Sequence, residues 1–157
     1  MTERSAPVTE RVYLSDAELR GSSVDLSHLE LPPVLRPDAR LSVLDITEFY
    51  GDTTGGIRTY LRQKSAYVEA RPQLRQVLVL PGPRDHFAES AGVRSYRLQG
   101  PKVPKQAPYR FMLATRTNRR IALHERPDVV EIGSPGFVPW IAKLATRGLR
   151  TPLRSEE

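Results

Sequence analysis

The sequence lacks cysteine, long apolar runs and an apolar leader, and each absence excludes a class of protein. Without cysteine, the 157 residues form no disulfide and no thiolate metal site. No apolar run reaches the roughly 18 residues that a transmembrane helix requires. The first residues, Met1 to Ser5, do not resemble a secretory signal. We therefore expect a cytoplasmic protein.

Several motifs of cofactor and catalytic chemistry are also missing. The sequence contains neither the G-x-G-x-x-G fingerprint of dinucleotide sites nor the G-K-[ST] of a P-loop. No serine lies in the G-x-S-x-G pattern of hydrolases. His28, His86 and His124 are isolated, without a partner at metal-ligand spacing. We expect no bound metal and no resident cofactor.

Positive charge is in surplus, with 24 Lys and Arg against 18 Asp and Glu, a formal net charge of +6. Such a surplus invites a nucleic-acid interpretation. The basic residues, however, do not alternate with aromatic residues, and no zinc-finger spacing or recognition helix is evident. A solvated surface, or one that faces anionic lipid, explains the charge better, and nucleic-acid binding is kept as a minor alternative.

Residues 1–40 differ in character from the rest of the chain. Their apolar residues occur singly, and the segment ends in a stretch with Pro32, Pro33 and Pro37, which blocks a helix and favours extended chain. We interpret residues 1–40 as a disordered or loosely structured tail with a short helix around 15–20, and residues 41–157 as one domain.

From residue 41 onward, apolar runs alternate with amphipathic stretches. The runs predict buried strands at 41–46, 76–80 and 128–132, a half-exposed or edge strand at 93–98, and helices at 57–68, 109–125 and 137–147. This order predicts an α/β, Rossmann-like three-layer domain with a parallel sheet. Ligands of such sheets bind outside the carboxyl ends of the strands, where both glycine-rich loops of this chain are expected.

The first glycine-rich loop is the strongest candidate site. Gly55 and Gly56 precede Ile57 and Arg58 at the start of a helix, so backbone N–H groups and the partial positive charge of the helix are open to a phosphate group. A tight turn without any ligand explains the glycine pair equally well.

Two further candidates follow along the chain. Glu131 ends a strand beside Gly133, Ser134 and Pro135, where a carboxylate suits sugar hydroxyls, although a plain exposed strand end is the alternative. The helix expected at 109–125 is basic on one side, with no acid before its last residue. This basic face suits anionic lipid or is simply solvated; its residues are Arg110, Arg116, Arg119 and Arg120.

From Leu41 to Leu153 the chain resembles the N-terminal domain of family 4 glycosyltransferases, retaining enzymes of the two-domain GT-B fold. The resemblance is nearest to bacterial GDP-mannose-dependent and related α-mannosyl- or glucosyltransferases. The segments that carry it are Asp45 to Tyr50, Gly55 to Leu61, Lys64, Val79 to Pro83, Gly100-Pro101, Tyr109 to Phe111 and Arg126 to Pro135.

The resemblance implies an acceptor-side domain that takes part in moving a hexose, mannose or glucose, from a nucleotide-diphosphate sugar to a lipid or sugar acceptor. It implies that the loop at Gly55-Gly56 approaches the donor diphosphate and that the loop from Glu131 to Pro135 borders the acceptor. It also implies peripheral contact with the inner face of an anionic membrane. The family continues beyond Leu153 with further strands and a donor-binding domain, so we expect an incomplete sheet. The half is then either inactive alone, as a decayed gene or a fragment, or is completed by a separately encoded C-terminal half. The alternative is a non-catalytic α/β module that binds a sugar phosphate or an anionic lipid surface.

Overall fold

The computed structural model describes residues 13–19, 24–51, 55–134 and 136–155. Its helices are α2 (Asp16–Leu19), α3 (Gly56–Glu69), α4 (Thr115–Glu125) and α5 (Val138–Ala145). Its strands are β1 (Leu41–Ile46), β2 (Leu74–Gly82), β3 (His86–Ser90), β4 (Val93–Gln99), β5 (Val129–Ile132) and β6 (Leu153–Ser155). The predicted alternation of strands and helices is confirmed.

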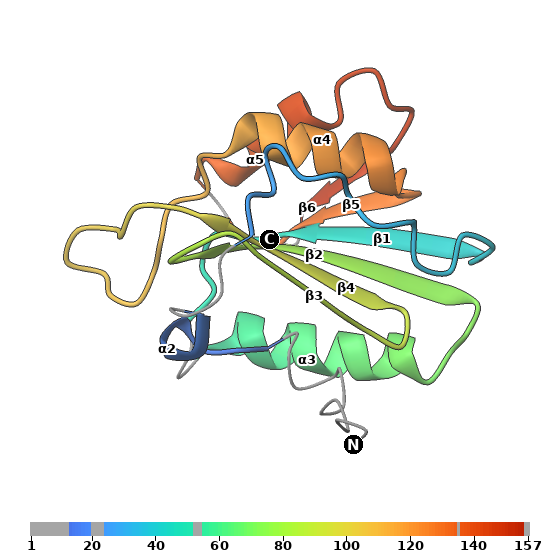
Figure 1. Cartoon of the computed structure of the whole chain (residues 1–157), viewed down its shortest axis with the longest axis horizontal. Coiled ribbons are helices and arrows are strands. Elements are labelled where there is room, and N and C mark those ends of the chain that lie inside the picture. The colour runs from blue at the N-terminus through green and yellow to red at the C-terminus, as the bar shows by residue number, and fades with distance from the viewer. Residues whose placement is uncertain (1–12, 20–23, 52–54, 135, 156–157) are drawn as a thin grey trace.

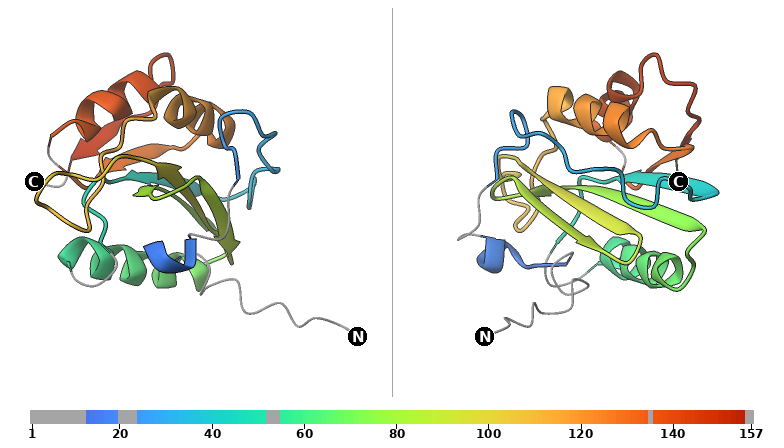
Figure 2. Two further views of the ribbon diagram at one scale, coloured as in Figure 1. Left: turned by 60° about the vertical axis from the view of Figure 1, so that its left-hand side comes forward. Right: turned by 45° about the vertical axis from the view of Figure 1, so that its right-hand side comes forward.

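The strands form one six-stranded sheet in the order β3-β4-β2-β1-β5-β6. All neighbours are parallel except β3, which runs antiparallel to β4. α3 covers one face of the sheet, and α4 and α5 cover the other (Figure 1). The turned views in Figure 2 show the same three layers. The expected α/β class is therefore correct, and the mostly parallel sheet is compatible with a Rossmann-like fold.

The central strands are apolar on both sides because both faces of the sheet are covered. On β2, Val77 and Val79 join the core under α4 and α5, whereas Leu78 and Leu80 join the core under α3. The alternation of side chains across a strand therefore distributes one apolar run between two cores. Among the described residues, no helix has both the length and the apolar character needed to cross a membrane.

The structure corrects two of the predicted elements. β4 is not an edge strand: β3, which the sequence analysis did not predict, lies outside it, and β4 is buried over six of its seven residues. The sequence of β4 alternates with polar residues because of Arg94 and Arg97. Both are buried, and they donate hydrogen bonds to Glu125 and to the carbonyl oxygen of Pro81, respectively. The predicted helix from Tyr109 begins only at Thr115, because the backbone around Phe111 instead bonds to Pro101.

The described part of the N-terminal segment packs against the domain. Leu26 and Leu31 are buried in the same core as Ile121 of α4. Arg36 donates from Nη1 to the carbonyl oxygens of Val68, Arg71 and Leu74 at 3.2, 2.9 and 2.8 Å. Residues 24–40 are thus not loosely structured, since single leucines and one arginine suffice to hold them. α2 lies within the short helix expected at 15–20.

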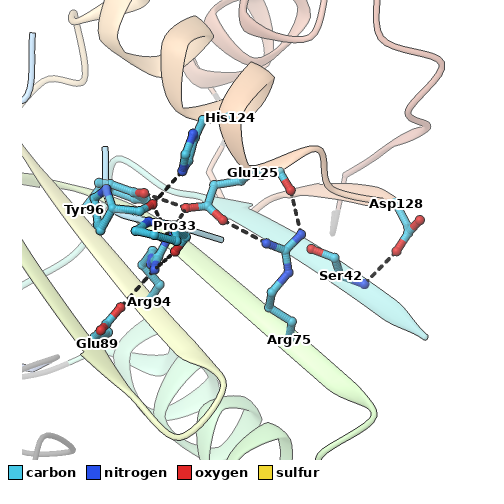
Figure 3. A network of polar contacts seen from close by, with 10 residues as sticks. Pro33, Ser42, Arg75, Glu89, Arg94, Tyr96, His124, Glu125 and Asp128 are labelled. Atoms are coloured by element: carbon cyan, nitrogen blue, oxygen red, sulfur yellow. Dashed lines mark hydrogen bonds and ion pairs between the residues drawn. The ribbon is translucent and has the colours of Figure 1, made fainter. Parts of the chain in front are cut away.

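A buried polar network joins this segment to the sheet and α4 (Figure 3). The carboxylate of Glu125 accepts hydrogen bonds from Arg75 at 2.9 Å, Arg94 at 2.8 Å and the Tyr96 hydroxyl at 2.5 Å. Arg94 also donates to the carbonyl oxygen of Pro33 at 2.6 Å. This network lies near the amino ends of β2 and β4, away from the edge where ligands of such sheets bind.

Candidate functional site

The strand order of the sheet reverses at β1. The chain passes from β1 through α3 to β2 on one side, and later places β5 on the other side of β1. In open α/β sheets a crevice forms at such a point, outside the carboxyl ends of the two strands. A pocket of about 200 Å³ lies there, lined by Asp45, Ile46, Thr47, Gly56, Ile57, Tyr60, Leu61, Glu131, Ile132 and Gly133.

Two acids line this pocket, and Lys64, which is not itself a lining residue, bridges them. Asp45 of β1 and Glu131 of β5 are paired in register on adjacent parallel strands, so their side chains share the α3 face of the sheet. Lys64 reaches down from α3 between them. Its Nζ lies 2.7 Å from Asp45 Oδ1 and 2.5 Å from Glu131 Oε2. One ammonium group therefore bridges two carboxylates.

The two acids differ in how fully their oxygens are engaged. Asp45 Oδ2 accepts a second hydrogen bond from Gln76 Nε2 at 2.8 Å, and Gln76 is held in turn by Ser65 at 2.7 Å. Glu131 uses Oε2 for Lys64 and, at 3.4 Å, for the Tyr60 hydroxyl. Its Oε1 has no hydrogen-bond partner among the described residues. Asp45 therefore orients Lys64, and Glu131 retains an acceptor for a ligand.

Burial and ion pairing act against each other on these groups. Burial, with a further contribution from the charge of Glu131, raises the pKa of Asp45 above its ordinary value, although Lys64 and Gln76 act to lower it. Burial opposes the charge of Lys64, but attraction to Asp45 and Glu131 outweighs it and raises the pKa of the ammonium group. Lys64 therefore stays protonated at neutral pH and is a fixed cation of the site.

The glycine pair lies beside these groups, at the beginning of α3. Gly55 has φ 144°, a backbone conformation that other residues rarely adopt, and it offers no side chain to cap the helix. The first turn has no acidic residue. Gly56 and Ile57 line the pocket, whereas Arg58 does not. The first N–H groups of a helix have no intrahelical acceptor, so this end of the pocket attracts an anion.

Only part of the loop after β5 lines the same pocket. Glu131 and Gly133 line it. Ser134 is buried; its Oγ lies 2.7 Å from Thr47 Oγ1 and accepts a hydrogen bond from the N–H of Glu48 at 2.8 Å. Ser134 therefore holds the chain that leaves β1. Pro135 lies outside the described residues.

Lys64 and Asp45 are site residues that the sequence pattern did not identify. Asp45 is an acid inside an otherwise apolar strand, and Lys64 lies on the packing face of α3, one turn after Tyr60. A charge in either place needs a partner, and that requirement is the signal that was available. Only the register of β1 with β5 places Glu131 as the second partner.

The arginines of the predicted basic face do not lie together. Arg110 forms an ion pair with Asp16 at 3.2 Å, and Arg120 donates to the carbonyl oxygen of Leu26 at 2.6 Å. Arg119 is exposed and donates to the carbonyl oxygen of Arg147 at 2.7 Å, while Arg116 is exposed on the same helix. Arg110 and Arg120 thus hold the N-terminal segment, and two of the four predicted residues remain on an outer surface.

The chemistry of the pocket is that of binding. Carboxylates accept hydrogen bonds from hydroxyl groups, and an uncapped helix start accepts phosphate. No group of three or more metal-binding side chains is found in the described part of the chain.

Comparison with protein-family models, with curated proteins and with solved structures finds no match to this chain.

Proposed function

We propose that this chain is the acceptor-side half of a GT-B-type glycosyltransferase, and that the pocket at the ends of β1 and β5 holds a hexose that carries a phosphate group. One observation carries the proposal. A carboxylate centre, which suits sugar hydroxyls, and the start of α3, where no described side chain caps the helix and which suits phosphate, line the same small pocket.

The dimensions of the pocket support a small ligand. Its volume of about 200 Å³ is below the roughly 300–1,000 Å³ of sites for drug-sized molecules. A single sugar ring with its phosphate suits this space, and the rest of a nucleotide sugar would extend outside it. Tyr60 at the mouth supplies an apolar ring surface of the kind on which a sugar ring stacks.

The transfer reaction in this proposal comes from the resemblance. A mannosyl or glucosyl group would pass from a nucleotide-diphosphate donor to a hydroxyl group of a lipid or sugar acceptor. The pocket residues bind and orient: Glu131 Oε1 accepts from a hydroxyl group, and Lys64 neutralises negative charge. Because both oxygens of Asp45 are already engaged, Asp45 holds Lys64 in position and does not remove a proton.

Ligand binding to the purified chain tests the pocket directly. Calorimetry and saturation-transfer NMR compare mannose 1-phosphate, mannose, inorganic phosphate and GDP-mannose. We expect mannose 1-phosphate to bind more tightly than mannose or phosphate alone, because only the phosphorylated sugar engages both ends of the pocket. Gly56→Trp fills the pocket and is expected to abolish this binding. Thr59→Trp, on the same helix but outside the pocket, is the matched control.

Transfer is measured separately, with labelled GDP-mannose and UDP-glucose and a membrane lipid extract. Label that enters lipid and depends on Gly56 supports the transferase. Binding of the sugar phosphate without transfer, also after addition of a candidate partner half, favours the non-catalytic binding module. Binding of mannose 1-phosphate that survives Gly56→Trp contradicts the proposed pocket.

A further inference from the structure

Helix α5 is apolar on two sides. One side, formed by Val138, Ile141, Ala142 and Ala145, is buried in the core. The other side exposes Phe137 by 61%, Trp140 by 67% and Leu144 by 48%. These three residues follow one another at intervals of three and four, so they form a continuous stripe. Phe137 makes an edge contact with Phe111, with ring centres 6.4 Å apart, and the stripe otherwise stands outside the core.

Basic side chains lie beside two residues of this stripe, Trp140 and Leu144. Lys143 lies 5.9 Å from the ring centre of Trp140. Leu144 shares a hollow of about 360 Å³ between α4 and α5 with Thr115, Arg116, Arg119 and Arg147. The only acid in α4 or α5 is Glu125, which is buried in the network of Figure 3. The surface is thus apolar along its centre and positive along its margin.

We propose that the stripe of Phe137, Trp140 and Leu144, with Lys143, Arg116, Arg119 and Arg147 around it, docks this chain onto an anionic membrane surface. Tryptophan prefers the boundary between lipid and water, and a helix that lies in that boundary buries one apolar side. Each basic residue near an anionic bilayer adds attraction. A second copy fits less well, since pairing two such faces brings like charges together.

The proposal is independent of the sugar pocket. The pocket opens on the α3 side of the sheet, at Asp45 and Glu131, whereas α5 lies on the opposite face (Figure 1). The proposed membrane surface also differs from the basic face expected from the sequence. Arg110 and Arg120 bond to the N-terminal segment instead, and α5 supplies the apolar residues.

Trp140 is the only tryptophan in the chain, so its fluorescence reports on this surface alone. We expect its emission to shift to shorter wavelength when vesicles of equal parts phosphatidylglycerol and phosphatidylcholine are added, and brominated lipid to quench it. Vesicles of phosphatidylcholine alone, or added salt, should weaken both effects. An emission that does not respond to anionic vesicles overturns the proposal.

Sedimentation with the same vesicles measures the partition coefficient of variants. Lys143→Gln is expected to lower it about fivefold, and Trp140→Ser to lower it about tenfold. The matched controls lie on α3: Arg62→Gln removes one charge and Tyr67→Ser one exposed ring, and neither should change binding. Circular dichroism checks that each variant is folded.

Two other outcomes also overturn the proposal. If Arg62→Gln weakens binding as much as Lys143→Gln, only net charge matters and no face is selected. If the fluorescence of Trp140 changes with protein concentration in the absence of lipid, and light scattering shows a dimer that Trp140→Ser abolishes, the stripe is a contact between copies of the chain.

Discussion

Single charged residues inside the strands are tolerated because another element supplies the opposite charge. Asp45 is 4% exposed and Arg94 is 2% exposed, yet neither lies in an apolar surrounding. Lys64 of α3 meets Asp45, and Glu125 of α4 meets Arg94. Removing one member of such a pair leaves an uncompensated charge, which costs more than the pair itself contributes.

Lys64→Met tests this reasoning in the candidate site. The variant leaves Asp45 and Glu131 side by side without their cation, and we expect the free energy of unfolding to fall by about 3 kcal/mol. Urea denaturation measures the change. Gln63→Met, at an exposed neighbouring position, should have little effect. Asp45→Asn combined with Lys64→Met should recover part of the lost stability. If the double variant loses as much free energy of unfolding as the two single variants together, the two residues are not coupled.

Tyr96→Phe tests the second network through pH. Burial, and then the charge of Glu125, raise the pKa of the Tyr96 hydroxyl above its ordinary 10.0. The folded chain therefore keeps a proton that the unfolded chain releases above pH 10. Stability from this group is complete below that pH and is lost as pH rises further.

In Tyr96→Phe this alkaline loss should be smaller, whereas stability at pH 7 should fall by about 1.5–3 kcal/mol because a hydrogen bond to a charged group is removed. Thermal unfolding followed from pH 7 to 11 measures both effects. An equally steep alkaline decline in the variant and in the unchanged chain would show that Tyr96 does not contribute to it.

At the scale of elements, the sheet positions the site and the start of one helix shapes it. β1 and β5 bring Asp45 and Glu131 together by register, and α3 begins at the mouth of the pocket. The positive φ of Gly55 turns the chain into α3, whereas Gly56 already belongs to the helix and has open space around it. The two adjacent glycines therefore have different structural roles.

A pair of alanine substitutions separates these roles. Gly55→Ala forces a side chain into a left-handed conformation, and we expect it to lower the free energy of unfolding by about 1–3 kcal/mol. Gly56→Ala meets no atom within 4 Å and should stabilise α3 by about 0.5–1 kcal/mol. Chemical denaturation of both variants gives the comparison. Equal effects would mean that the conformation of Gly55 is not strained for alanine.

At the scale of the whole molecule, the N-terminal segment completes the core. Leu26 is fully buried against the α4 side of the sheet, and the arginines Arg36, Arg94 and Arg120 bond to the segment or anchor it to the sheet and helices. This arrangement makes residues 24–40 part of the domain that they precede in sequence.

Leu26→Ala should therefore behave as a core substitution and lower the free energy of unfolding by about 2–5 kcal/mol. Leu29→Ala, three residues along and 48% exposed, should change it by less than about 0.5 kcal/mol. Both are measured by urea denaturation. Similar small effects from the two substitutions would show that the segment does not contribute to the core.

The sequence alone determined the order and type of most elements. The run 76–80 is mostly apolar because β2 is buried on both faces, so its pattern identifies a strand directly. The glycines that begin α3 were recognisable for the same local reason, since a turn into a helix is decided by neighbouring residues. The resemblance to glycosyltransferases stays a prediction.

Only the tertiary structure decided what depends on distant partners. The pairing of Lys64 with Asp45 and Glu131 requires the register of β1 with β5, which no local pattern contains. β4 looked half exposed because its sequence contains Arg94 and Arg97. Both arginines are in fact buried, because they bond to an acid and to carbonyl groups elsewhere in the chain. The N-terminal segment looked loose because its leucines are too few to form a core alone, and they become buried only against a surface that the rest of the domain builds.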